Sequence, residues 1–201
     1  MLLESQRKET PFDVRDNMLE LWNQLTELSF RGYGLQKRKP PKEPKNFSVW
    51  SEESKKKYNE KLQEKLKNQQ HWDQKFIDNE FKVIDDLCRR IVYLIDRANS
   101  MNPQYLCEWD KQRLYHDEAI GLCYNLKREL NHIAETIPCN KNFLTLQIDT
   151  VLKEISLLQG WRKKNNPKRG EITQKEIERR KSLAEKIGFI LATEGLISPS
   201  E

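Results

Sequence analysis

The residues of this sequence best suited to chemistry are basic, and they gather in two segments. Residues 31–45 hold six Lys and Arg against one Glu, and residues 161–181 hold nine against three Glu. Aromatic residues lie in or beside both segments. Positive grooves with aromatic platforms hold single-stranded nucleic acid. The sequence therefore predicts a polyanion-binding surface formed by Arg31, Lys37, Arg38, Lys39, Lys42, Lys45, Trp161, Arg162, Lys163, Lys164, Lys168, Arg169, Arg179, Arg180 and Lys181.

The segment around Trp161, written LQGWRKKNNPKRGEI, has two interpretations. The indole ring could stack on a base, or it could close the end of a helix against a core. Cations are favoured at a helix C-terminus, which accounts for Arg162 and Lys163 without a ligand. It does not explain why the charge continues through the following turn into the next predicted helix. Both roles of Trp161 stay open at this point.

Metal and cofactor chemistry has little support in the sequence. Cys107 with His116, or His132 with Cys139, could meet around zinc, but structural zinc sites usually have paired ligands two to four residues apart. The four cysteines contain no such pair. We therefore expect no metal ion and no cofactor.

A catalytic site is also not expected, although one alternative stays open. Helical ribonucleases of the HEPN group carry an Arg, four to six residues and then a His. Here Arg128 precedes His132 by three intervening residues, and Lys127 has the four-residue spacing. The acidic residues nearby more simply form surface ion pairs. The sequence therefore predicts that the protein is not an enzyme. The alternatives are a HEPN-like ribonuclease or toxin component and a helical scaffold without nucleic-acid binding.

The elements that position these residues are predicted to be helices, because the chain has only 7 Gly in 201 residues and long apolar stripes of helical period. The stripes predict helices over residues 13–30, 51–99, 110–136, 142–158 and 171–194. Ser51 is the expected N-cap of the second helix, and Thr173 with Glu176 forms an expected capping box of the fifth. Pro167 and Gly170 predict a break before that fifth helix.

The expected fold is all-α, an antiparallel four-helix bundle with an N-terminal basic Pro-rich segment and an extra C-terminal helix. Residues 1–71 form the N-terminal extension, whose first helix may join the bundle, 72–166 the bundle core and 167–201 the C-terminal helix and tail. Ile91, Leu126 and Ile155 are predicted core residues, and Leu114 and Leu152 are placed on the same inner faces. The absence of an apolar run near ~18 residues and of a secretory leader in MLLESQRKET predicts a cytoplasmic protein without membrane contact.

Three strings carry a resemblance to a known family. IDRANSMNP, RLYHDEAIGLCYNLKREL and EISLLQGWRKKNN resemble the accessory variability determinants of diversity-generating retroelements, which occur in gut bacteria and their phages. The similarity covers about residues 72–166.

The resemblance implies a four-helix-bundle subunit of a homopentamer with a basic surface. Such a protein binds the reverse transcriptase of the retroelement and its template RNA, and it supports mutagenic cDNA synthesis without an active site of its own. Within the shared strings, Arg162, Lys163 and Lys164 are the contacts implied by position. The present chain adds an N-terminal arm and a further C-terminal helix to the short form of the family.

Overall fold

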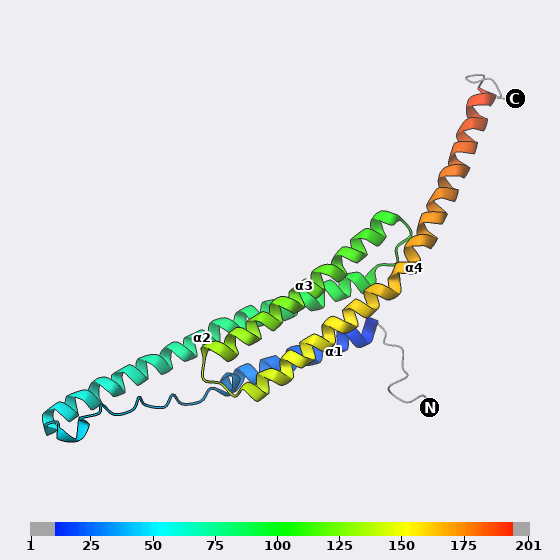
Figure 1. Ribbon diagram of the computed structural model, residues 1–201. Coiled ribbons are helices and arrows are strands. Elements are labelled where there is room, and N and C mark those ends of the chain that lie inside the picture. The colour runs from blue at the N-terminus through cyan, green and yellow to red at the C-terminus, as the bar shows by residue number, and fades with distance from the viewer. Residues whose placement is uncertain (1–10, 195–201) are drawn as a thin grey trace, which may run out of the picture.

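Four long helices make up most of the computed structural model, which describes residues 11–194 (Figure 1). They are α1 (Pro11–Phe30), α2 (Glu52–Ser100), α3 (Leu106–Thr136) and α4 (Lys141–Thr193). Two short 3-10 turns, η2 (Gly32–Gly34) and η3 (Phe47–Val49), lie in the connection between α1 and α2. The described part of the chain contains no strand.

The four helices form an antiparallel bundle in which each packs against the next, and α1 closes the ring against α4 (Figure 1). The all-α four-helix fold is therefore confirmed. One core runs through the bundle and includes the predicted Ile91, Leu126 and Ile155, all buried. The Ser51 cap is also confirmed, since its side chain accepts a hydrogen bond from the Ser54 N–H.

Two inner-face predictions are wrong. Leu114 is 54% exposed and Leu152 is 38% exposed. Leu152 lies at the edge of the buried stripe of α4. Leu114 lies on the side of α3 opposite its buried stripe, in which the polar Gln112 and His116 occupy the inner face. An apolar residue alone does not identify the inner face, because neighbouring helices decide which side of each helix is packed.

Two helices are longer than the bundle and project from its opposite ends (Figure 1). At one end, α2 has no buried residue before Asp73, and the α1–α2 connection runs back along it. We call residues 35–70 the arm. At the other end, α4 has no buried residue after Ile172. We call residues 163–193 the tail.

The predicted break at Pro167 is wrong, since α4 continues through Pro167 and Gly170 to Thr193. The predicted fourth and fifth helices are therefore one helix. Proline lacks an N–H, so only the carbonyl of Lys163, one turn earlier on an exposed part of the helix, loses its intrahelical partner.

Contacts from α3 hold α4 in line across this point. Arg113 Nη1 donates to Asn166 Oδ1 at 2.6 Å, and Trp109 Nε1 donates to the Asn165 carbonyl at 3.4 Å. The expected Thr173–Glu176 capping box is wrong as well, because Glu176 lies inside α4. Its carboxylate instead accepts a hydrogen bond from the Leu106 N–H, at 2.7 Å, at the start of α3.

Replacing Ile91, Leu126 or Ile155 by Ala should lower the free energy of unfolding by about 2–5 kcal/mol each. The reason is that all three side chains are buried in the core. Leu114→Ala is the matched control and should change it by less than about 0.5 kcal/mol. Urea unfolding followed by circular dichroism measures the difference, and similar losses at all four positions would contradict the assigned core.

Candidate nucleic-acid interface

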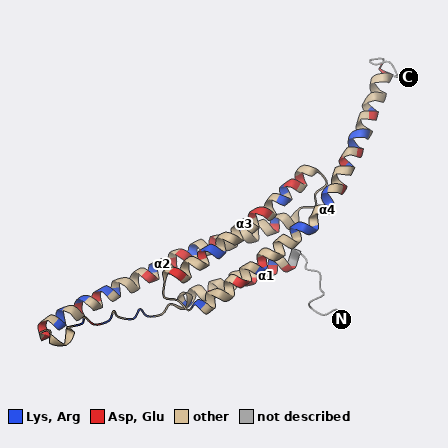
Figure 2. Cartoon of the chain, in the orientation of Figure 1, with Lys and Arg blue, Asp and Glu red and all other residues tan. Residues whose placement is uncertain are grey.

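Positive charge is concentrated in the arm and the tail. The arm has eleven basic and five acidic residues, and the tail has nine and four, which gives net charges of +6 and +5. The bundle between them, residues 11–30 and 72–162, has thirteen basic and eighteen acidic residues, a net charge of −5. Figure 2 shows Lys and Arg along both projections and mixed charges over the bundle. Polyanions are therefore attracted to the two projections rather than to the bundle.

The base of the arm is fixed by a charged pair that the sequence did not reveal. Arg38 donates from Nε to Asp73 Oδ2 at 2.8 Å and from Nη2 to Oδ1 at 2.6 Å. Asp73 is only 2% exposed, and this hydrogen bonding raises the pKa of Arg38 above its ordinary value. A two-bond contact to a buried carboxylate defines both position and orientation. Arg38, predicted as a polyanion contact, is thus a structural clamp.

Backbone contacts tie the same end of the arm to the connection between α3 and α4. Gln36 N–H donates to the Pro138 carbonyl at 2.7 Å, and Asn140 N–H donates to the Gly34 carbonyl at 3.2 Å. The chain enters this contact through a left-handed turn in which Tyr33 has φ +50° and Gly34 has φ +69°. A side chain at Gly34 would meet Asn140 and Phe143 at 3.2 Å, so the turn favours glycine there.

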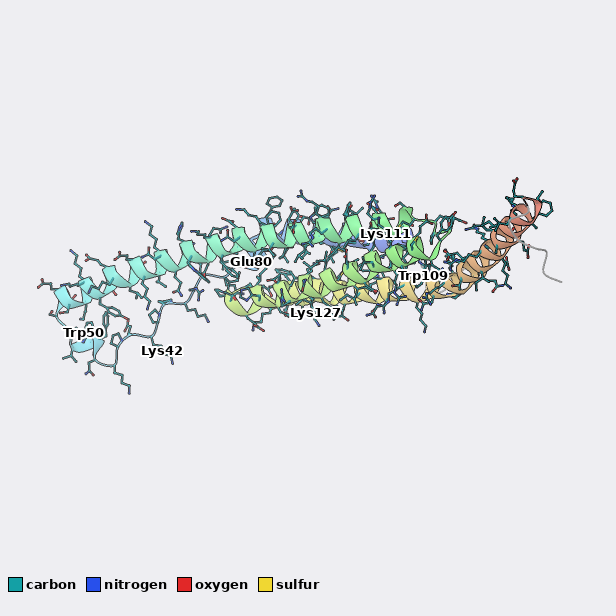
Figure 3. The ribbon with its side chains drawn as sticks, turned by 90° about the horizontal axis from the view of Figure 1, so that it is seen from above. Lys42, Trp50, Glu80, Trp109, Lys111 and Lys127 are labelled. Atoms are coloured by element: carbon teal, nitrogen blue, oxygen red, sulfur yellow. The ribbon has the colours of Figure 1, made fainter. Side chains whose placement is uncertain are left out.

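The tip of the arm is closed by three aromatic rings. Phe47, Trp50 and Tyr58 have mutual centroid distances of 5.4–5.6 Å and join the end of the loop to the first turns of α2. Figure 3 shows Trp50 at this tip and Lys42 on the loop between tip and base. The arm is thus held at both ends. Between them Lys37, Lys39, Lys42 and Lys45 are exposed, as is Arg31 just before the arm.

Trp161 closes the core and is not available to stack on a base. It is 9% exposed, and its ring packs edge-on against the ring of His116 with centroids 4.2 Å apart. The neighbouring Arg162 donates from Nη1 to Asp117 Oδ1 at 2.5 Å. The structure therefore assigns Trp161 the second of its two predicted roles, and Arg162 is held by an ion pair to α3.

The remaining arginines predicted in residues 161–181 also have partners. The Arg169 guanidinium lies 5.6 Å from the centre of the Trp109 ring, and that of Arg179 lies 5.0 Å from the Tyr105 ring. Arg180 pairs with Glu176 at 3.8 Å. Figure 3 shows Trp109 where α4 leaves the bundle. The four lysines predicted here, Lys163, Lys164, Lys168 and Lys181, are exposed and form no ion pair with any described residue.

His116 is the most perturbed basic group in this junction. It is 1% exposed, and no described group bonds to its Nε2. Its pKa falls from 6.5 to about 4, chiefly because burial disfavours the imidazolium. Arg113 lowers the pKa further, Asp117 opposes the shift and Arg162 adds to it. His116 is therefore neutral in the folded protein at neutral pH.

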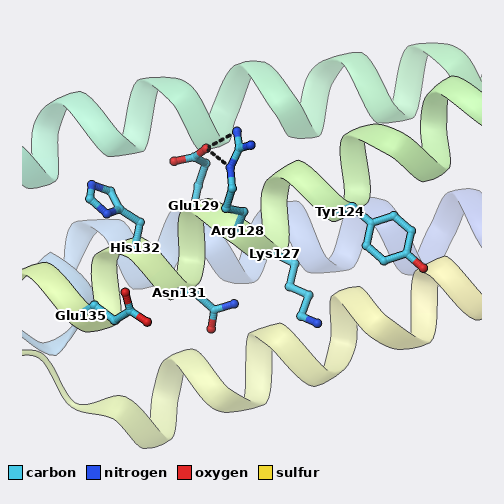
Figure 4. Close-up of a pocket in the computed structure, with 7 residues that line it drawn as sticks. All are labelled: Tyr124, Lys127, Arg128, Glu129, Asn131, His132 and Glu135. Carbon is cyan, nitrogen blue, oxygen red and sulfur yellow. Dashed lines mark hydrogen bonds and ion pairs between the residues drawn. The ribbon is translucent and has the colours of Figure 1, made fainter.

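The two residues of the ribonuclease alternative lie one turn apart on α3. Arg128 and His132 border an open depression together with Tyr124, Lys127, Glu129, Asn131 and Glu135 (Figure 4). The Arg128 guanidinium bonds to Glu129 Oε1 at 3.1 Å. The His132 ring packs edge-on against Phe76, and its Nδ1 lies 3.3 Å from the Thr136 hydroxyl. Both side chains thus have local partners on the surface of the bundle.

Across residues 11–194, no three His, Cys, Asp or Glu side chains gather in a way that could hold a metal ion. Cys88, Cys123 and Cys139 are buried thiols, and Cys107 is an exposed one. None of the described helices is long and apolar enough to cross a membrane. In comparisons with known proteins, no family model, curated protein or solved structure matches this chain.

Stability should fall between pH 6.5 and about 4 because of His116. The unfolded chain takes up a proton at His116 in this range and the folded protein does not, so the stabilisation is complete above pH 6.5 and lost towards pH 4. The shift corresponds to at most about 3 kcal/mol. Urea unfolding at several pH values measures it. His116→Gln should flatten the pH dependence, and a variant as acid-sensitive as the wild type would contradict this assignment.

Proposed function

We propose that this protein is a noncatalytic accessory factor that binds nucleic acid through its two basic projections. The observation that carries the proposal is the separation of charge, with +6 in the arm and +5 in the tail beside a bundle of −5. A protein that needed charge only for solubility would gain nothing from this separation. Two projecting basic elements suit a ligand that is long and anionic.

The lysines are the part of the predicted surface that supports this role. Arg38, Arg162, Arg169, Arg179 and Arg180 are occupied by intramolecular contacts. Arg169, Arg179 and Arg180 are nevertheless exposed. The exposed residues without an ion pair or ring contact in the described chain are Arg31, Lys37, Lys39, Lys42, Lys45, Lys163, Lys164, Lys168 and Lys181. Exposed lysines contact phosphates as point charges and do not distinguish between bases in the way that positioned arginines do. We therefore propose binding that depends on backbone charge and little on sequence.

The resemblance of the bundle strings to accessory variability determinants suggests the biological setting. In that setting the partner is a reverse transcriptase, and the nucleic acids are its template RNA and the cDNA. The role of the protein is then to hold RNA and cDNA while the polymerase performs the mutagenic synthesis. Co-purification of a reverse transcriptase with this protein from its native host tests that partnership directly.

The salt dependence of RNA binding tests the tail. Lys163→Gln with Lys164→Gln should reduce the slope of log K against log salt by about 1.4 per engaged subunit, because each phosphate contact on a single strand contributes about 0.7. Both side chains are exposed, so unfolding should be unaffected. Lys75→Gln with Lys82→Gln, two exposed lysines of the bundle, is the control. Equal slopes for the wild type and both variants would remove the tail from the binding surface.

The protein is also proposed to assemble with copies of itself, as a pentamer if the resemblance holds in detail. Large apolar side chains such as Phe30, Tyr93 and Leu146 are more than half exposed on the bundle. Contact with another copy would remove them from water. Multi-angle light scattering at micromolar concentration should show a mass several times that of the 24.1 kDa chain. A monomer at that concentration would contradict the assembly.

A further inference from the structure

The arm carries a row of lysines on α2 that the sequence analysis did not single out. Lys57, Lys61 and Lys65 recur at steps of four, which places them along one flank of the helix about 6 Å apart. All three are exposed, and none forms an ion pair with a described residue. Like charges at this spacing destabilise a helix that stands alone. Lys57 and Lys61 have acidic residues three or four positions away, but Lys65 has none, so the charge of Lys65 is not compensated along the helix.

The other sides of the same helix segment have different chemistry. Tyr58, Leu62 and Leu66 are half-buried, and they face the loop of the arm, because Leu62 and Leu66 line depressions together with loop residues. The 3.6-residue repeat places the acids Glu53, Glu60 and Glu64 on the side away from the loop. The flank opposite the lysine row presents the neutral amides of Asn59, Gln63 and Gln70, with Lys56 and Lys67 between them and the acidic side. Lys55 lies on the side of the loop and is paired with Glu52. A row of three lysines at steps of four is thus found on one flank only.

The loop supplies a second edge to that flank. A depression between loop and helix is lined by Lys39 and Pro41 from the loop, and by Leu62 and Lys65 from α2. Its two lysines come from opposite walls. Next to these lysines along the chain, Lys42 follows on the loop and Lys61 lies one turn before Lys65 on α2, and both are exposed. We call this depression together with Lys42 and Lys61 the arm groove.

We propose that the arm groove binds the backbone of one strand of single-stranded RNA, with lysines of the loop and of α2 on its two sides. This inference rests on the proposed function and specifies its ligand. The lysine repeat along α2 is close to the spacing of successive phosphates on a strand. The row of lysines lies on one flank only, and the acids Glu53, Glu60 and Glu64 on the side away from the loop would repel a second strand.

The rigidity of the arm supports a binding role. The Arg38–Asp73 pair fixes its base, and the rings of Phe47, Trp50 and Tyr58 fix its tip. These anchors keep the loop beside α2, although Leu35 alone among the residues of the arm packs against the bundle core. Holding the two rows of lysines at a constant separation lowers the entropy lost when a strand binds between them.

The test compares two pairs of lysines on the same helix. Lys61→Gln with Lys65→Gln removes two charges from the groove, and Lys56→Gln with Lys67→Gln removes two exposed charges outside it. The probe is a fluorescein-labelled oligouridine of about 20 nucleotides, titrated with the full chain at several salt concentrations. The groove variant should bind about 25-fold more weakly near 0.1 M salt, with a slope smaller by about 1.4, and the control pair should stay within about twofold of wild type. Thermal unfolding of both variants should match wild type.

Several results would overturn the groove. If both lysine pairs weaken oligouridine binding equally, the attraction is diffuse and the groove is not a site. If neither pair weakens binding, the arm is not a binding surface. The proposed function then still stands if the Lys163 and Lys164 changes reduce RNA binding. In another outcome, the wild type binds duplex RNA or phosphatidylserine vesicles more tightly than oligouridine. If Lys61→Gln with Lys65→Gln abolishes that binding, the groove has a different ligand. If the wild type binds no oligouridine, the proposed function fails together with the groove.

Discussion

The mismatch in helix length is the constraint on which this structure depends. α1 and α3 have 20 and 31 residues, about 30 and 46 Å, whereas α2 and α4 have 49 and 53 residues. Two shorter helices cannot cover two longer ones along their whole length, so α2 and α4 both leave the bundle. The two run in the same direction, and the excess lies before Asp73 in α2 and after Ile172 in α4, so the projections are at opposite ends (Figure 1). The arm and the tail follow from this mismatch.

Each projection is stabilised by local contacts in place of a core. The loop covers one side of α2 in the arm, and the start of α3 braces α4 through Trp109, Arg113 and Leu106. These contacts are polar or aromatic for the most part, so the exposed surface of both projections stays available for charge. The same contacts keep α4 helical across Pro167, which removes one intrahelical hydrogen bond.

Much of the fold was predictable because helical periodicity is a local signal. The core positions Ile91, Leu126 and Ile155 and the Ser51 cap were identified from neighbours within a few turns. Pro167 misled the prediction because the contacts that override it come from α3, more than fifty residues earlier. For the same reason the intramolecular partners of Arg38 and Arg162 could not be predicted. Their carboxylate partners, 35 and 45 residues away, are brought to them only by the folded chain.

The basic residues that the fold uses differ in type from those that it leaves exposed. Arg38, Arg162, Arg169, Arg179 and Arg180 all contact a carboxylate or an aromatic ring, whereas every lysine predicted on the surface lacks an ion pair within the described chain. The planar guanidinium can form two parallel bonds or stack on a ring, and the ammonium of lysine is a strongly hydrated point charge. Arginine therefore fixes the two projections to the bundle. Lysine supplies a mobile positive surface that can follow an irregular strand of phosphates, which is the property that the proposed function requires.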